Sequence, residues 1–171
     1  MEVTRSTKII VGMLLSVIVG SAIAADNNQT VAKANPRYAI KGGEVYDKKS
    51  ELTWQRCSVG QRWVEETGCV GFVKVFTFDD AQTLGNGTWR VPTKDELASL
   101  IDQNRVAQGQ IPGIDPVAFP DMNLTRLGYW SSTPNSAMTA WGVRFGEGDI
   151  GYGYGAYRSL TYAVRLVRTG Q

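Results

Sequence analysis

The sequence contains no histidine. Histidine is the commonest general base in enzymes and the commonest protein ligand of transition metals. Its absence excludes Ser-His-Asp catalysis, Cys-His catalysis and the usual zinc sites. Cysteine is almost as scarce, since the chain has only Cys57 and Cys69. Their spacing is not C-x-x-C, so it does not indicate a redox motif.

The apolar run from Ile9 to Gly20 is too short to span a bilayer comfortably, which takes about 20 residues. Arg5 and Lys8 precede it, and the small residues Ser21-Ala22-Ile23-Ala24 follow. This order is typical of a secretory signal peptide, so we expect residues 1–24 to be removed between Ala24 and Ala25. Cleavage predicts a periplasmic or secreted protein with no membrane span. The alternative is that the segment remains as an uncleaved N-terminal anchor.

The exported chain is expected to hold one domain, residues 37–171, behind a flexible leader at residues 25–36 that is polar and small. Lys and Arg total 18 and Asp and Glu total 16, so the net charge is +2. The segment from Arg126 to Arg168 contains five arginines and two acidic residues, which gives a local net charge of +3. That excess permits an anionic partner without requiring one, and nothing indicates nucleic acid.

In an oxidising compartment, Cys57 and Cys69 are predicted to form a disulfide. Closing so short a loop would stabilise the fold by about 3 kcal/mol. A reactive thiol pair is the alternative, and it would need accessible sulfurs in an electropositive setting. Arg56 and Arg62 lie nearby in the sequence. We expect the pair to be structural, with turns on both sides of Trp63.

The periodicity of the chain predicts an α+β fold with an antiparallel sheet, two short helices and long loops. The helices are expected at 77–84 and after Thr93, where Glu96 completes a capping box. Residues 103–127 and the glycine-tyrosine stretch 146–159 are expected to be irregular. The strands are expected at 38–45 with a turn at Gly42-Gly43, 52–56, 129–133, 140–145 and 162–168.

Several segments together resemble a known family: LTWQRC, GQRW, CVG, WRVPTKDELASLID, YWSST, WGVRF and YAVRLVR. Their order is similar to the C-terminal domain of the Legionella collagen-like protein, also known as domain of unknown function 1566. The resemblance covers about Tyr38 to Arg168. It implies the formylglycine-generating-enzyme branch of the C-type-lectin-like fold, also called sulfatase-modifying-factor-like, in which the N- and C-terminal strands pair.

The resemblance also implies that the W-R-x-P-T segment is a structural corner. Trp89 is expected to pack, Arg90 to pair with carbonyls or a carboxylate, and Thr93 to cap the next helix with Glu96. A well-paired, buried arginine suits this role because its planar group meets several acceptors. Trp130 is expected in the core.

No catalytic residue, cofactor or metal is predicted, and the chain is expected not to be an enzyme. The enzyme branch of the fold uses cysteines in its C-terminal half, whereas this chain has none after Cys69. The calcium-lectin signatures Glu-Pro-Asn and Trp-Asn-Asp are absent. The alternative is a hard cation bound through the carboxylate oxygens of Asp115, Asp121 and Glu147 or Asp149.

A C-terminal surface is the candidate binding site, because tyrosine and arginine with glycine spacers favour recognition. The alternative is that the tyrosines pack over the core. The expected function is a recognition module for a glycan, another polyanion or a partner protein. The alternative is a protein-directed inhibitor, an immunity protein or a periplasmic subunit. The predicted ligand-binding residues are Trp141, Arg144, Tyr152, Tyr154, Tyr157 and Arg158, with Glu147 and Asp149 beside them.

Overall fold

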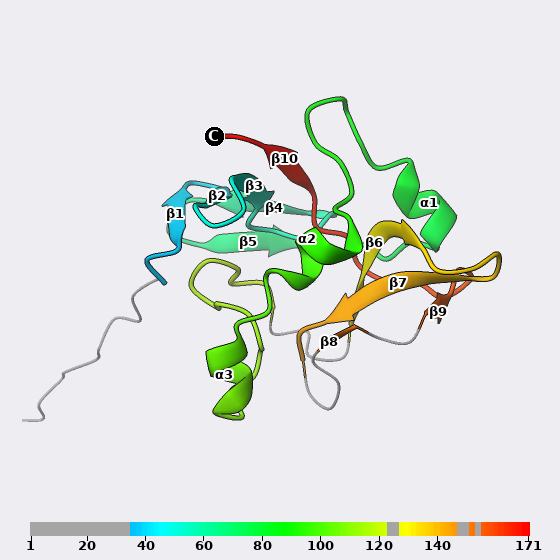
Figure 1. Ribbon diagram of the computed structural model, residues 1–171. Helices are drawn as coiled ribbons and strands as arrows, with labels where there is room; N and C mark the ends of the chain where they lie inside the picture. The colour runs from blue at the N-terminus through cyan, green and yellow to red at the C-terminus, as the bar shows by residue number, and fades with distance from the viewer. Residues whose placement is uncertain (1–34, 123–126, 147–150, 153–154) are drawn as a thin grey trace, which may run out of the picture. The chain divides into compact units, whose positions relative to one another are not determined.

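The computed structural model describes residues 35–122, 127–146, 151–152 and 155–171 (Figure 1). The predicted signal peptide, its cleavage site and residues 25–34 of the predicted leader lie outside this part of the chain. Tyr154, Glu147 and Asp149 lie outside it as well, and Tyr152 is described by its backbone alone.

One antiparallel sheet contains the first three strands and the last one, in the order β1-β2-β3-β10. Gly42 has a φ of 52°, a conformation that glycine adopts without steric cost, and it makes the turn between β1 and β2. Trp54 is the central residue, paired with Val45 on one side and Val167 on the other. The strands are β1 (Tyr38–Lys41), β2 (Glu44–Asp47), β3 (Leu52–Gln55) and β10 (Val167–Thr169).

The resemblance implied that the first and last strands pair with each other, and this expectation is wrong. β10 pairs with β3, whereas β1 lies at the opposite edge of the same sheet. The segment predicted as a strand from 162 to 168 is a strand only from Val167 onward. Before that it makes isolated bridges, in which Tyr162 pairs with Phe76 and Ala163 with Tyr129.

A small hairpin overlaps the disulfide loop, where only turns were expected. β4 (Gln61–Val64) and β5 (Gly68–Gly71) pair antiparallel, and Trp63 faces Cys69 in their register. The backbone groups of this short segment bond to one another across the hairpin, which satisfies them without long strands.

The second large sheet is built on β7, which lies between β6 and two very short strands (Figure 1). β8 pairs with the end of β7 at Val143 and Arg144, and β9 pairs with its start at Thr139 and Ala140. The glycine-tyrosine stretch thus contributes two strands that sequence periodicity missed. The strands are β6 (Gly128–Pro134), β7 (Thr139–Arg144), β8 (Gly151–Tyr152) and β9 (Ala156–Tyr157).

Three short helices are present in the described residues, one more than predicted: α1 (Phe78–Gln82), α2 (Lys94–Ala98) and α3 (Gln103–Ala107). Thr77 caps α1 and Thr93 caps α2, where Thr93 and Glu96 form the capping box. The unpredicted α3 lies in the stretch expected to be irregular. Its cap is Asp102, whose carboxylate accepts from the amides of Asn104 and Arg105.

Two buried clusters hold these elements together. The larger joins the first sheet, α2 and one face of the β6–β7 pair, and it includes the fully buried Trp54, Leu97 and Tyr129. The smaller joins α1 to the other face, where Trp130 is fully buried and donates its indole N–H to the Phe76 carbonyl at 2.8 Å.

The described residues thus form three small antiparallel sheets with short helices, which agrees with the α+β class at that level. None of the helices among them has the length and apolar character to cross a membrane.

Candidate functional site

An arginine without any solvent exposure lies at the centre of the domain. Arg165 donates through Nη1 to the carbonyls of Gln55 at 2.7 Å and Arg56 at 2.5 Å, and through Nη2 to Asp121 Oδ1 at 2.5 Å. Burial acts against its charge, but Asp121 and Tyr129 outweigh that effect and raise the pKa of Arg165. The guanidinium therefore stays charged and ties three distant segments together.

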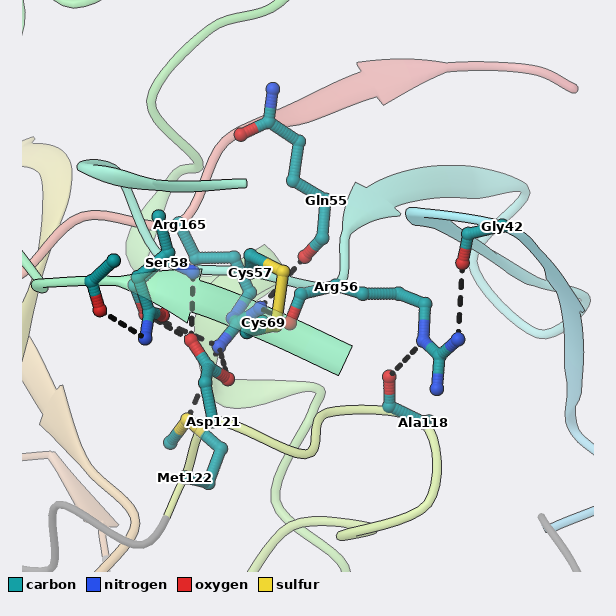
Figure 2. Close-up of a disulfide and its surroundings, with 12 residues drawn as sticks. Gly42, Gln55, Arg56, Cys57, Ser58, Cys69, Ala118, Asp121, Met122 and Arg165 are labelled. Atoms are coloured by element: carbon teal, nitrogen blue, oxygen red, sulfur yellow. Dashed lines mark hydrogen bonds and ion pairs between the residues drawn. A yellow bond between two sulfur atoms is a disulfide. The ribbon is translucent and has the colours of Figure 1, made fainter. Parts of the chain in front are cut away.

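Asp121 is bound from the other side by Ser58, which donates its amide at 2.7 Å and its hydroxyl at 2.6 Å (Figure 2). The Ser58 hydroxyl also lies 2.8 Å from the phenol oxygen of Tyr129. Burial raises the pKa of the Tyr129 phenol. This network is structural, because its hydrogen bonds join Gln55, Ser58, Asp121 and Arg165, which come from distant parts of the chain.

The predicted disulfide between Cys57 and Cys69 is confirmed. Next to it, Arg56 donates to the carbonyls of Gly42 at 3.0 Å and Ala118 at 3.2 Å (Figure 2). Its guanidinium also lies 3.7 Å from the centroid of the Trp63 ring. Arg56 therefore fixes the disulfide hairpin against the rest of the domain, which is a packing role and not activation of a thiol.

A second buried carboxylate anchors the start of the domain. Arg37 forms an ion pair with Asp47 and donates to the Ser99 carbonyl at 2.8 Å. Burial acts to raise the pKa of Asp47, but hydrogen bonds from Arg37, Ser50 and the Lys49 amide outweigh it, so the pKa lies below its ordinary value.

The end of the predicted flexible leader is held in place. The Asn35 amide donates to Asp115 at 2.8 Å, and the Pro36 carbonyl accepts from the Lys48 side chain at 2.9 Å. Asn35 and Pro36, which the prediction placed in the leader, are thus hydrogen-bonded to residues of the domain.

At the W-R-x-P-T corner, Arg90 pairs with a carboxylate, as one of the two predicted options had it. Both of its terminal nitrogens lie 2.7 Å from the Glu96 oxygens. Hydrogen bonding from Arg90 lowers the pKa of Glu96. The Arg90 side chain is 43% exposed, however, so the buried arginine expected here is instead Arg165. Trp89 is half-buried, with the Arg168 guanidinium 5.4 Å from its ring centroid.

The predicted ligand-binding residues on β7 lie on opposite faces of their sheet. Arg144 lies with Tyr162, whose hydroxyl accepts from it at 3.3 Å, and Gly142 packs on the same ring. Trp141 is half-buried on the face of α2, where the Lys94 ammonium lies 5.7 Å from its ring centroid. Successive strand residues alternate between faces, which separates positions 141 and 144.

Tyr157 and Arg158, in contrast, lie together at a groove of about 510 Å³. Tyr157 is 61% exposed, and Met138 beside it is 63% exposed. Arg158 forms an ion pair with Asp79, and its guanidinium lies 4.7 Å from the Phe78 ring centroid. We call this the tip groove, and its lining is Thr77, Asp79, Ala137, Met138, Tyr157, Arg158 and Ser159.

The backbone of Arg158, a residue that lines the tip groove, is held by hydrogen bonds on both sides. Its amide donates to the Met138 carbonyl at 3.0 Å, and its carbonyl accepts from the Phe78 amide at 2.9 Å. One residue therefore connects the β6–β7 turn to the start of α1. Sequence reasoning missed Met138 and Asp79, which are 20 and 79 positions away from Arg158 and carry no local signal.

The local excess of arginines does not form an open cationic surface in the described residues. Arg144 contacts Tyr162, Arg158 pairs with Asp79, and Arg165 pairs with Asp121. Arg168 donates to Glu44 at 2.8 Å. Each of these four positive charges is engaged within the fold.

The candidate cation ligands are also engaged where they are described. Asp115 accepts from the amides of Asn35, Val117 and Ala118, and Asp121 is paired with Arg165. Within the part of the chain that the structure describes, no three cysteine or acidic side chains gather as a metal site would require.

Comparison with known proteins identifies the family of this chain. No curated protein matches the chain. The family model of the Lcl C-terminal domain matches residues 43–168, which include β2 to β9, the three described helices and the disulfide hairpin, but not β1. Because this match covers most of the sequence, the chain belongs to the Lcl C-terminal domain family.

Proposed function

We propose that this chain is a non-enzymatic recognition module outside the cytoplasm that binds a partner protein through the tip groove. Membership of a bacterial family and a disulfide are consistent with an extracytoplasmic location. The observation that carries the proposal is the pairing of two mostly exposed, large side chains, Met138 and Tyr157, beside a groove on fixed backbone. Such a combination of adaptable and rigid apolar groups favours protein recognition.

A glycan or another polyanion is the weaker option for this groove. Its arginine is already neutralised by Asp79, so the groove offers little net charge to an anion. Part of the proposal is that the fold is C-type-lectin-like, supported by its loop-rich sheets and by the shared sheet of its first and last strands. An inhibitor, an immunity protein or a periplasmic subunit would use the same groove.

The test is capture from a cell-envelope extract with the exported chain, starting at residue 25, as bait. We expect a Met138→Ala/Tyr157→Ala variant to lose a protein that the unchanged chain retains. Phe72→Ala is the matched control, because Phe72 is 92% exposed but lies outside the groove. Equal recovery by all three baits would contradict the proposal.

Salt then separates the ligand classes. Exposed charges are screened within about 10 Å at 0.1 M salt and within about 3 Å at 1 M. Binding to an apolar groove should therefore persist at high salt, whereas a polyanion should be released. An activity measurement on the captured protein, with and without this chain, distinguishes an inhibitor from a subunit.

A further inference from the structure

Methionine is scarce in the part of the chain that follows the predicted signal peptide. Met1 and Met13 lie within residues 1–24, which leaves Met122 and Met138. Both cysteines are joined in the disulfide, so no free thiol competes for an oxidant. In an oxidising compartment, the thioether sulfurs of these two methionines are therefore the groups that a peroxide would attack.

The two sulfurs lie in opposite environments. Met122 is 3% exposed, and Arg165 donates through Nη2 to its sulfur at 3.2 Å (Figure 2). Burial keeps an oxidant away from Met122, and the guanidinium engages the sulfur lone pairs that would react. Met138, in contrast, is 63% exposed. An oxidant must touch the sulfur to react with it, so accessibility favours Met138.

Met138 is also held at the tip groove by its backbone. Its amide donates to the Ser136 hydroxyl at 3.2 Å, and its carbonyl accepts from the Arg158 amide at 3.0 Å. Its side chain lines the groove together with that of Tyr157. A chemical change at the Met138 sulfur therefore changes the surface of the groove itself.

We infer that Met138 is a site of reversible oxidation and that its sulfoxide stops partner binding at the tip groove. The second half of this inference rests on the function proposed above. In the free chain, a lone pair of the Met138 sulfur attacks one oxygen of hydrogen peroxide, and the O–O bond breaks. The proton of the transferred hydroxyl passes to the departing hydroxide, which leaves as water. The sulfur loses two electrons to the peroxide, and methionine sulfoxide reductases restore the thioether.

The sulfoxide weakens binding because it makes an apolar contact polar. Its oxygen is a hydrogen-bond acceptor, and burying an acceptor under an apolar partner surface is unfavourable unless a donor meets it. Arg158, the positively charged donor of the groove, is already paired with Asp79. We therefore expect oxidation of Met138 to weaken partner binding at least about tenfold.

The site of oxidation is tested without any partner. The exported chain, starting at residue 25, is treated with dilute hydrogen peroxide, digested and analysed by mass spectrometry for the addition of one oxygen atom. We expect Met138 to be oxidised at least about tenfold faster than Met122 in the folded protein, because Met122 is reached only when the core opens. In urea the two rates should become equal. Equal rates in the folded protein would overturn the inference.

The effect on binding is tested by capture from a cell-envelope extract, after the peroxide has been removed from the bait. The oxidised bait should lose the protein that the Met138→Ala/Tyr157→Ala variant also fails to retain. Met138→Leu has no sulfur at this position, so its own capture should be the same before and after peroxide. Met122→Leu should still lose the protein after peroxide. Treatment of the oxidised bait with methionine sulfoxide reductases should restore capture, which is a readout that needs no variant.

Two results would contradict the switch: a bait fully oxidised at Met138 that still retains the protein, or a Met138→Leu bait that loses it after peroxide. An untreated bait that retains no protein would contradict the proposed function, and the switch with it. The peptide analysis would still decide whether Met138 is the oxidised residue. Failure of the oxidation site is therefore distinguishable from failure of the proposed function.

Discussion

Replacing Arg165 by methionine removes the charge at the centre of the fold while keeping an unbranched side chain. Asp121 would then keep only the amide and hydroxyl of Ser58, and the carbonyls of Gln55 and Arg56 would lose their donor. Both side chains of the ion pair are fully buried, so water cannot replace the lost interaction.

Removing one partner of a buried ion pair typically costs about 3–5 kcal/mol, because the other charge is left uncompensated. Since small domains are stable by only about 5–15 kcal/mol, this would be a large part of the free energy of unfolding. We expect that loss for Arg165→Met in urea denaturation followed by tryptophan fluorescence. The double variant Arg165→Met/Asp121→Asn should lose less, because no isolated charge remains.

Arg168→Met is the matched control. Its partner Glu44 is 46% exposed, and a pair of that kind contributes about 0–1 kcal/mol. If Arg165→Met were no more destabilising than Arg168→Met, the central role assigned to the buried pair would be refuted. A double variant worse than Arg165→Met alone would also contradict the argument, because it would show that charge burial is not the main cost.

Three further predictions concern stability. The pKa of Asp47 is lowered in the folded state, so Asp47 stabilises the fold above its unfolded pKa near 3.8, and this stabilisation is lost as the pH falls below that value. The free energy of unfolding, measured from pH 5 to pH 2, should show this loss. The Asp47→Asn variant should show a weaker dependence on pH. Replacing Cys57 and Cys69 together by alanine should cost about 3 kcal/mol in the same assay, and an equal stability with and without reductant in the unchanged protein would contradict this. Thr93→Ala should cost about 1 kcal/mol through loss of the helix cap, whereas Thr88→Ala, at an exposed position outside the helix, should be neutral.

Local patterns were sufficient for the elements whose cause is local. The capping box at Thr93 and the turn at Gly42 each depend on groups within a few residues, so the sequence predicted them. The helix after Asp102 had a local signal too, the carboxylate cap before Gln103, but its single turn lacks an apolar period. The strands near 151 and 156 had none, because two-residue strands exist only by pairing with β7.

The candidate sites were less predictable. Arg165 was read as part of a general positive excess, although Val164 and Ala163 beside it are fully buried and its apolar neighbours were a usable sign. The tip groove joins residues from segments far apart, and no spacing rule connects Tyr157 with Met138.

By itself the sequence determined the chemistry available: no histidine, one possible disulfide, and apolar periods that require a small α+β core. Only the tertiary structure decided which charges are buried in pairs, which aromatic rings are covered and which face solvent. The reason is physical, because alternation and capping act over a few residues, whereas burial depends on contacts such as that between Ser58 and Asp121, which are 63 positions apart.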